Sequence, residues 1–166
     1  MPQKSAREET PSHRYFRACV GRWRSPVALT IEDPGALAAS GMSWLDRVSL
    51  RTLAGWPGWL PPIWMHTSVA FDPMGEVVHR TVIRCLGIPL RRTVERFALQ
   101  PDGRRFVVSG DMSGEGEVED DGAHARYALR WLGVDIRQET TREPDLVTVR
   151  QTGPGFSGTQ RLVRQA

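Results

Sequence analysis

The chain has 166 residues, of which 40% are hydrophobic and 25% are charged, values typical of one globular domain that buries its own core. No stretch approaches the ~18 consecutive apolar residues of a membrane helix. The polar N-terminus does not predict a secretory signal.

The charge and the cysteines exclude further classes. The net charge is +3 and Lys4 is the only lysine, an arginine bias that fits a GC-rich bacterial coding sequence. The arginines are spread along the chain among Asp and Glu, whereas a nucleic-acid binder clusters them, so no nucleic-acid partner is expected. Cys19 and Cys85 form no CxxC pair, which argues against zinc and redox motifs. We expect a cytoplasmic protein with two free thiols and no metal or cofactor; the oligomeric state is left open.

The first elements are a lead-in and a strand. Residues 1–14 are expected to be a disordered N-terminal lead-in, with a single barrel domain over residues 15–166. Residues 16–31, which contain Gly21-Arg22-Trp23, are predicted as strand one and stop at Glu32-Asp33-Pro34.

A short helical pair follows. Asp33 is a predicted N-cap with Pro34 in the first turn, for a helix that runs to about Ser40. Ser43 and Asp46 have the spacing of a capping box for a second helix that ends at Gly55.

Residues 56–64 contain three prolines and a glycine, which forbid a regular helix or central strand. The segment is too apolar for a solvated linker, so we expect its tryptophans to be buried. Two alternatives remain evenly open, a rigid wall of a ligand portal and a plug packed on the helices, with docking on a membrane or partner as a minor one.

From residue 65 onward the hydrophobic pattern alternates with period two, which predicts strands. Turn sequences such as Pro101-Asp102-Gly103 and Asp121-Gly122 separate them. The predicted strands cover residues 65–72, 77–86, 88–99, 105–112, 115–119, 123–132, 134–141, 146–152 and 156–164.

About ten strands in consecutive hairpins indicate a mainly β fold, an antiparallel up-and-down barrel with the helical pair between its first two strands. Closure removes the exposed edges of such a meander. A two-sheet sandwich is the competitor, but it normally needs longer crossing connections.

Alternation then assigns the interior, because successive side chains of a strand point to opposite faces. The outward arginines leave an apolar lining with a few polar groups. Such a mixture is typical of a hollow that holds a small molecule, since a filled core avoids unpaired polar groups. The predicted ligand-binding residues are His79, Thr81, Ile83, Glu95, Phe97, Tyr127, Leu129, Trp131 and Gln138.

The Gly21-x-Trp23 motif, the helical pair and the run of hairpins together resemble the calycin superfamily, the lipocalins and fatty-acid-binding proteins. The resemblance implies that Trp23 plugs one end of the barrel under an arginine of the last strand, Arg161 or Arg164, with Arg161 taken as the plug residue. It also implies that the helices cover the ligand entrance. The fatty-acid clamp Arg-x-Tyr is replaced by Arg161-Leu162-Val163, which argues against such a clamp, and the absence of a histidine beyond His124 argues against haem.

Three functions stay open at this point. The first is binding or sequestration of a small hydrophobic or amphipathic molecule inside the barrel. The second is an isomerase or cyclase acting on an apolar substrate, with His79, Glu95 and Tyr127 as acid/base groups. The third is a structural or partner-binding module with a filled barrel. For His79 and Glu95 the simpler alternative is a satisfied core histidine and a carboxylate paired with an arginine of an adjacent strand.

Overall fold

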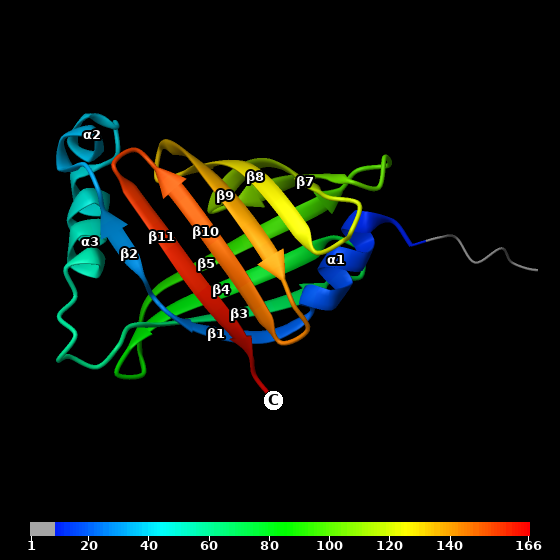
Figure 1. Ribbon diagram of the computed structural model, residues 1–166, viewed down its shortest axis with the longest axis horizontal. Helices are drawn as coiled ribbons and strands as arrows, with labels where there is room; N and C mark the ends of the chain where they lie inside the picture. Colours follow the sequence, from blue (N-terminus) through cyan, green and yellow to red (C-terminus); the bar gives the residue numbers. More distant parts are fainter. Residues whose placement is uncertain (1–8) are drawn as a thin grey trace, which may run out of the picture.

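The structure is a computed structural model that describes residues 9–166, and Figure 1 shows its arrangement. Those residues form three helices and eleven strands. In chain order these are α1 (Pro11–Cys19), β1 (Gly21–Pro26), β2 (Leu29–Ile31), α2 (Pro34–Ala39), α3 (Trp44–Ala54), β3 (Trp64–Phe71), β4 (Val77–Cys85), β5 (Ile88–Leu99), β6 (Arg105–Gly110), β7 (Met112–Val118), β8 (His124–Trp131), β9 (Val134–Arg142), β10 (Leu146–Gly153) and β11 (Phe156–Arg164).

The sheet closes on itself. Each strand from β3 to β10 pairs antiparallel with the next, and β1 pairs with both β3 and β11. Trp23 lies opposite Arg164, and β2 continues along β11 in the same register, with Ile31 opposite Phe156. β1 and β2 are therefore two halves of one strand interrupted near Pro26, and the predicted ten-strand up-and-down barrel is confirmed.

The helical pair forms as predicted. The Asp33 carboxylate accepts hydrogen bonds from the N–H groups of Gly35 and Ala36 at 2.8 and 3.0 Å, and Pro34 begins α2. The Ser43 hydroxyl accepts from the Asp46 N–H at 3.2 Å and caps α3. Both helices cover one end of the barrel (Figure 1).

The first predicted strand is wrong over its N-terminal part. Residues 16–19 belong to α1, which begins at Pro11 behind the N-cap Thr10. Helix periodicity brings Tyr15, Phe16 and Cys19 onto one buried face, and this burial outweighs the strand propensity of the segment. Residues 11–14 are thus helical rather than disordered, and residues 1–8 of the predicted lead-in lie outside the described part.

α1 lies at the end of the barrel opposite α2 and α3 (Figure 1). Its Phe16 side chain is fully buried and contacts Phe97 and Phe106, with ring centroids 5.2 and 5.1 Å apart. Tyr127 packs on Phe106 at 5.0 Å. An aromatic core therefore fills the α1 end, so any hollow must lie toward the other end.

The predicted strand over residues 105–112 is confirmed as far as Gly110 and is wrong beyond it, because the chain turns at Asp111. Gly110 has φ +118°, and a Cβ there would collide with the Val94 carbonyl oxygen. The Asp111 carboxylate accepts from the Val94 N–H at 2.7 Å. This close approach to β5 ends β6 at Gly110 and starts β7 at Met112.

Candidate ligand cavity

A cavity of about 620 Å³ lies between the inner barrel wall and α3. Drug-sized ligands need ~300 Å³ or more, so the alternative of a filled barrel is wrong. α3 contributes Val48, Thr52 and Leu53 to the lining, and the strands contribute apolar side chains such as Met65 and Val149. A second hollow of about 660 Å³, near Asp135 and Pro154, is a shallow depression outside the barrel.

Seven of the nine predicted ligand-binding residues line this cavity. They come from β4, β5, β8 and β9, and they are His79, Thr81, Ile83, Glu95, Tyr127, Trp131 and Gln138. Phe97 and Leu129 point inward as predicted, but they are only 3% and 4% exposed and belong to the packed core. Phe97 is covered by Phe16 of the unforeseen helix α1, which explains that miss.

Most polar side chains of the cavity satisfy one another across neighbouring elements. Thr67 and Thr81 share a hydrogen bond of 3.1 Å between their hydroxyl oxygens. The hydroxyls of Tyr15 and Tyr127 are 3.4 Å apart, and the Gln151 amide donates to the Gln138 carbonyl oxygen at 3.5 Å. The tyrosine predicted as a ligand donor thus has a protein partner in α1.

His79 and Glu95 are directly opposite each other on β4 and β5. Glu95 is 2% exposed, and neither its Oε1 nor His79 Nε2 has a hydrogen-bond partner among the described residues. Neither the predicted acid/base pair nor the alternative Glu95–arginine ion pair therefore forms as a contact. Two residues that line the same hollow thus each carry a buried polar atom without a partner.

Burial shifts the pKa values of His79 and Glu95 in opposite directions. It lowers the pKa of His79 to about 4, so the imidazole is neutral at pH 7. It raises the pKa of Glu95 to about 7, while the Thr93 hydroxyl opposes part of that shift. At neutral pH the cavity therefore presents a neutral imidazole beside a carboxyl group that is about half protonated.

Comparison with solved structures shows that other proteins have a similar fold. Fatty-acid-binding protein 1 of Echinococcus granulosus superposes over 90% of this chain and 99% of its own, with a TM-score of 0.53 and 12% identity. A Schistosoma mansoni fatty-acid-binding protein in complex with arachidonic acid covers 92% of this chain and 99% of its own, with a TM-score of 0.50 and 13% identity.

The barrel has the same fold as these fatty-acid-binding proteins. No family sequence model and no curated protein matches the chain, so the likeness to the calycins is one of architecture. Within residues 9–166, no helix has both the length and the apolar character needed to cross a bilayer.

Trp23 packs under an arginine of the last strand, the arrangement that the resemblance implies. Trp23 is 2% exposed, and its indole N–H donates to the Cys19 carbonyl oxygen at 2.7 Å. The guanidinium of Arg164 lies 4.3 Å from the indole centroid. Arg161, taken as the plug, is instead exposed and contacts Ser25 through its backbone N–H; Arg164 takes this place because it is the register partner of Trp23.

The segment over residues 56–64 divides between the cavity and the solvent. Trp56 and Ile63 line the cavity, and the Trp56 indole donates to the Pro61 carbonyl oxygen at 3.0 Å. Trp64 lies on the outer wall under Arg24, whose guanidinium is 3.6 Å from its ring. Trp59 is 83% exposed, so the expectation that every tryptophan is buried is wrong there. Part of the segment thus forms a cavity wall.

Sequence reasoning missed the residues that α1 and the β4–β5 hairpin add to the cavity, namely Tyr15, Cys19, Leu90 and Arg91. The signal for α1 is present in the sequence: Thr10-Pro11 is a helix start. A signal for Arg91 is also present, because alternation places it on the same face of β5 as Thr93 and Glu95. The packing of α3 brings its guanidinium to 3.8 Å from the Asp46 carboxylate.

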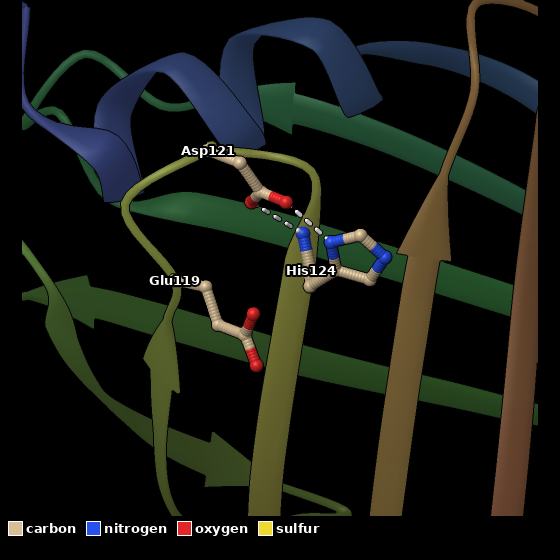
Figure 2. A group of neighbouring side chains, drawn as sticks. All are labelled: Glu119, Asp121 and His124. Carbon is tan, nitrogen blue, oxygen red and sulfur yellow. Dashed lines mark hydrogen bonds and ion pairs between the residues drawn. The ribbon is translucent and has the colours of Figure 1, made fainter.

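A group of acidic and imidazole side chains lies outside the cavity, at the β7–β8 turn (Figure 2). His124 binds the Asp121 carboxylate, and Glu119 pairs with Arg126 at 3.0 Å. Hydrogen bonds from the Ala123 N–H and the His124 ring hold the pKa of Asp121 below its usual range. Turn formation and surface ion pairs account for these three residues.

The arginines do cluster in space, contrary to the sequence argument. Pairing of β1, β3, β4 and β5 gathers five of them on one outer wall: Arg22, Arg24, Arg80, Arg84 and Arg92. In the described part of the chain, none of the five has a carboxylate within ion-pair distance. The sequence did not reveal this cluster, because strand pairing brings together arginines that are far apart along the chain.

Proposed function

We propose that the protein binds and sequesters a small hydrophobic or amphipathic molecule inside the barrel. The observation that carries this proposal is the cavity of about 620 Å³, walled mainly by apolar side chains and containing a few placed polar groups. The arachidonic acid complex of the similar Schistosoma barrel adds support for an apolar ligand.

The first test is whether the hollow binds an apolar probe. Val149 lines the cavity, whereas Val107 is exposed on the outer face of β6. Val149→Trp places an indole in the hollow and should weaken Nile red binding by about tenfold, a loss of about 1.4 kcal/mol. Val107→Trp is the matched control and should leave the Kd unchanged.

Native mass spectrometry of the purified protein provides an independent readout, since a sequestered molecule adds a discrete mass to the folded chain. Circular dichroism checks that both variants fold. Nile red binding that is identical in wild type and Val149→Trp would place the probe outside the cavity and contradict the proposal.

A second candidate is an isomerase or cyclase in the same cavity. It is favoured by one observation: a carboxyl group with a raised pKa faces the hollow beside a neutral imidazole, as general acid/base groups often do. In this case His79→Ala and Glu95→Gln should abolish turnover and leave ligand affinity near that of wild type. Intact turnover in both variants would remove this candidate.

We also propose the cytoplasm as the compartment. Both cysteines are free thiols, Cys19 buried and Cys85 half-buried. Burial raises the pKa of Cys19 to about 11, and a thiol that stays protonated reacts slowly. Fractionation of the native cells checks this placement.

A further inference from the structure

The polar side chains of the cavity lining differ in whether they have a hydrogen-bond partner in the protein. The threonine, tyrosine and glutamine pairs described above already have partners, so no ligand is needed to satisfy them. Among the described residues of the lining, the buried polar atoms without a partner are Glu95 Oε1, His79 Nε2 and Thr140 Oγ1. The first two belong to opposed residues of β4 and β5 and so form one polar spot on an otherwise apolar wall.

Burying such atoms without hydrogen bonds costs about 1–3 kcal/mol each. A ligand group that bonds to both would recover this free energy on binding. We infer, on the basis of the proposed ligand-binding function, that the cavity selects an uncharged apolar molecule with a polar group that both donates and accepts hydrogen bonds, as a primary amide does, and that Glu95 and His79 bind this group.

The charges around the spot disfavour a ligand carboxylate there. Arg91 is the only cationic side chain of the described lining, and it lies 3.8 Å from Asp46 of α3. The groups that face Glu95 are His79 from β4, Thr93 and Arg91 from its own strand, and Asp111 after β6. A fatty-acid anion at this spot would therefore meet the Glu95 carboxyl group and a neutral imidazole, while the cation Arg91 is already paired with Asp46.

The protonated Glu95 carboxyl group complements a primary amide in two hydrogen bonds, since it donates to the amide carbonyl and accepts from the amide N–H. The ionised carboxylate keeps only the second. His79 offers a donor at one ring nitrogen and an acceptor at the other in either tautomer. Because burial holds the Glu95 pKa near 7, affinity for an amide should fall as the pH rises from about 6 to about 8.

The experiment compares two probes of equal chain length, decanamide and decanoate, by displacement of Nile red at both pH values. Wild type should bind decanamide about tenfold more tightly than decanoate at the lower pH, which is the net gain from one to two hydrogen bonds. The preference should shrink at the higher pH.

Three variants locate the effect. Glu95→Leu should weaken decanamide binding and strengthen decanoate binding, a change of opposite sign that a general structural defect would not produce. Glu95→Gln keeps a donor and an acceptor, and should keep the preference while abolishing its pH dependence. Glu115→Gln removes the same charge from the exposed face of β7 and should behave as wild type.

Two outcomes overturn the inference in distinguishable ways. If wild type binds Nile red and prefers decanoate, or if Glu95→Leu weakens both probes equally, the uncharged-ligand inference is wrong and the container function stands. If Nile red and both probes fail to bind wild type, the proposed function fails and this inference fails with it.

Discussion

At the scale of single residues, the opposite pKa shifts of His79 and Glu95 make the stability of the protein depend on pH. Where the folded state holds Glu95 protonated and the unfolded state does not, between pH 4.5 and about 7, stability falls as pH rises. Where the folded state holds His79 neutral and the unfolded state protonates it, between about pH 4 and 6.5, stability rises with pH. The two contributions cancel where the windows overlap.

We predict that single substitutions separate the contributions of Glu95 and His79 to the pH dependence of the unfolding free energy. Relative to wild type, Glu95→Gln should gain unfolding free energy by about 1.4 kcal/mol per pH unit from pH 4.5 to 7. The unfolding free energy of His79→Phe should fall relative to that of wild type at the same rate as the pH rises from about 4 to 6.5. Urea unfolding at several pH values measures both, with Glu115→Gln as the control for charge.

A flat difference between Glu95→Gln and wild type over that range would show that the carboxyl group titrates normally in the folded state. It would also remove the protonated carboxyl group from the ligand model above.

Arg164 is a second residue with a specific role. It stacks on Trp23 and donates hydrogen bonds at 2.8 Å to the carbonyl oxygens of Val20 and Ala18, at the C-terminal end of α1. A cation is favourable at that end of a helix dipole. One side chain therefore joins the last strand, the first strand and α1.

We expect Arg164→Met to lower the unfolding free energy by about 1–3 kcal/mol, because the stacking and the charged hydrogen bonds are lost together. Arg161→Met, three residues earlier and exposed, should change it by less than about 0.5 kcal/mol. Urea denaturation compares them, and equal effects of the two substitutions would contradict the plug assignment.

At the scale of elements, helix α1 closes one end of the barrel. Phe16→Ala should cost about 3–5 kcal/mol, since a fully buried aromatic side chain leaves a void that the surrounding rings cannot close. Arg17→Ala on the exposed side of the same helix should cost less than about 0.5 kcal/mol. Thermal unfolding measures both, and a small effect of Phe16→Ala would mean that α1 does not pack on the barrel.

The β6–β7 corner depends on one glycine. Gly110→Ala brings a Cβ onto the Val94 carbonyl oxygen and should destabilise by more than the ~1 kcal/mol of a strained but uncrowded position. Gly133→Ala provides that comparison, because Gly133 also has positive φ, +81°, but nothing lies near its missing Cβ. Equal losses, measured by urea unfolding, would show that the corner is not crowded.

At the scale of the whole molecule, the charge is unevenly distributed. The wall of β1, β3, β4 and β5 carries the five arginines without ion-pair partners, whereas β7 to β9 carry mixed charges such as Arg130 with Asp135 at 3.0 Å. None of the five is the direct cross-strand partner of another, but like charges gathered on one face of a sheet repel through the solvent.

We predict that salt stabilises the protein by screening this repulsion. Raising NaCl from about 0.05 to about 0.5 M should increase the unfolding free energy by about 0.5 kcal/mol. The double variant Arg80→Gln/Arg92→Gln should lose most of that increase, while Arg130→Gln, in the mixed-charge half, should retain it. A salt response unchanged in the double variant would contradict the argument.

The sequence by itself determined the elements that obey local rules. Period-two alternation with turn residues defined the strands from β3 onward, and the caps Asp33 and Ser43 defined α2 and α3, because these signals act within a few residues. Alternation also identified His79, Glu95 and Tyr127 as inward, since a strand has only two faces.

Only the tertiary structure decided what depends on contacts between distant segments. Helix α1 forms where a strand was predicted because burial of Phe16 against β5 and β6 outweighs local preference. The packing of α1 in turn decides which inward residues form the core and which line the cavity. Alternation alone therefore could not assign Phe97 to the core. Strand register, which no local pattern reveals, placed Arg164 rather than Arg161 on Trp23 and gathered the arginines on one wall.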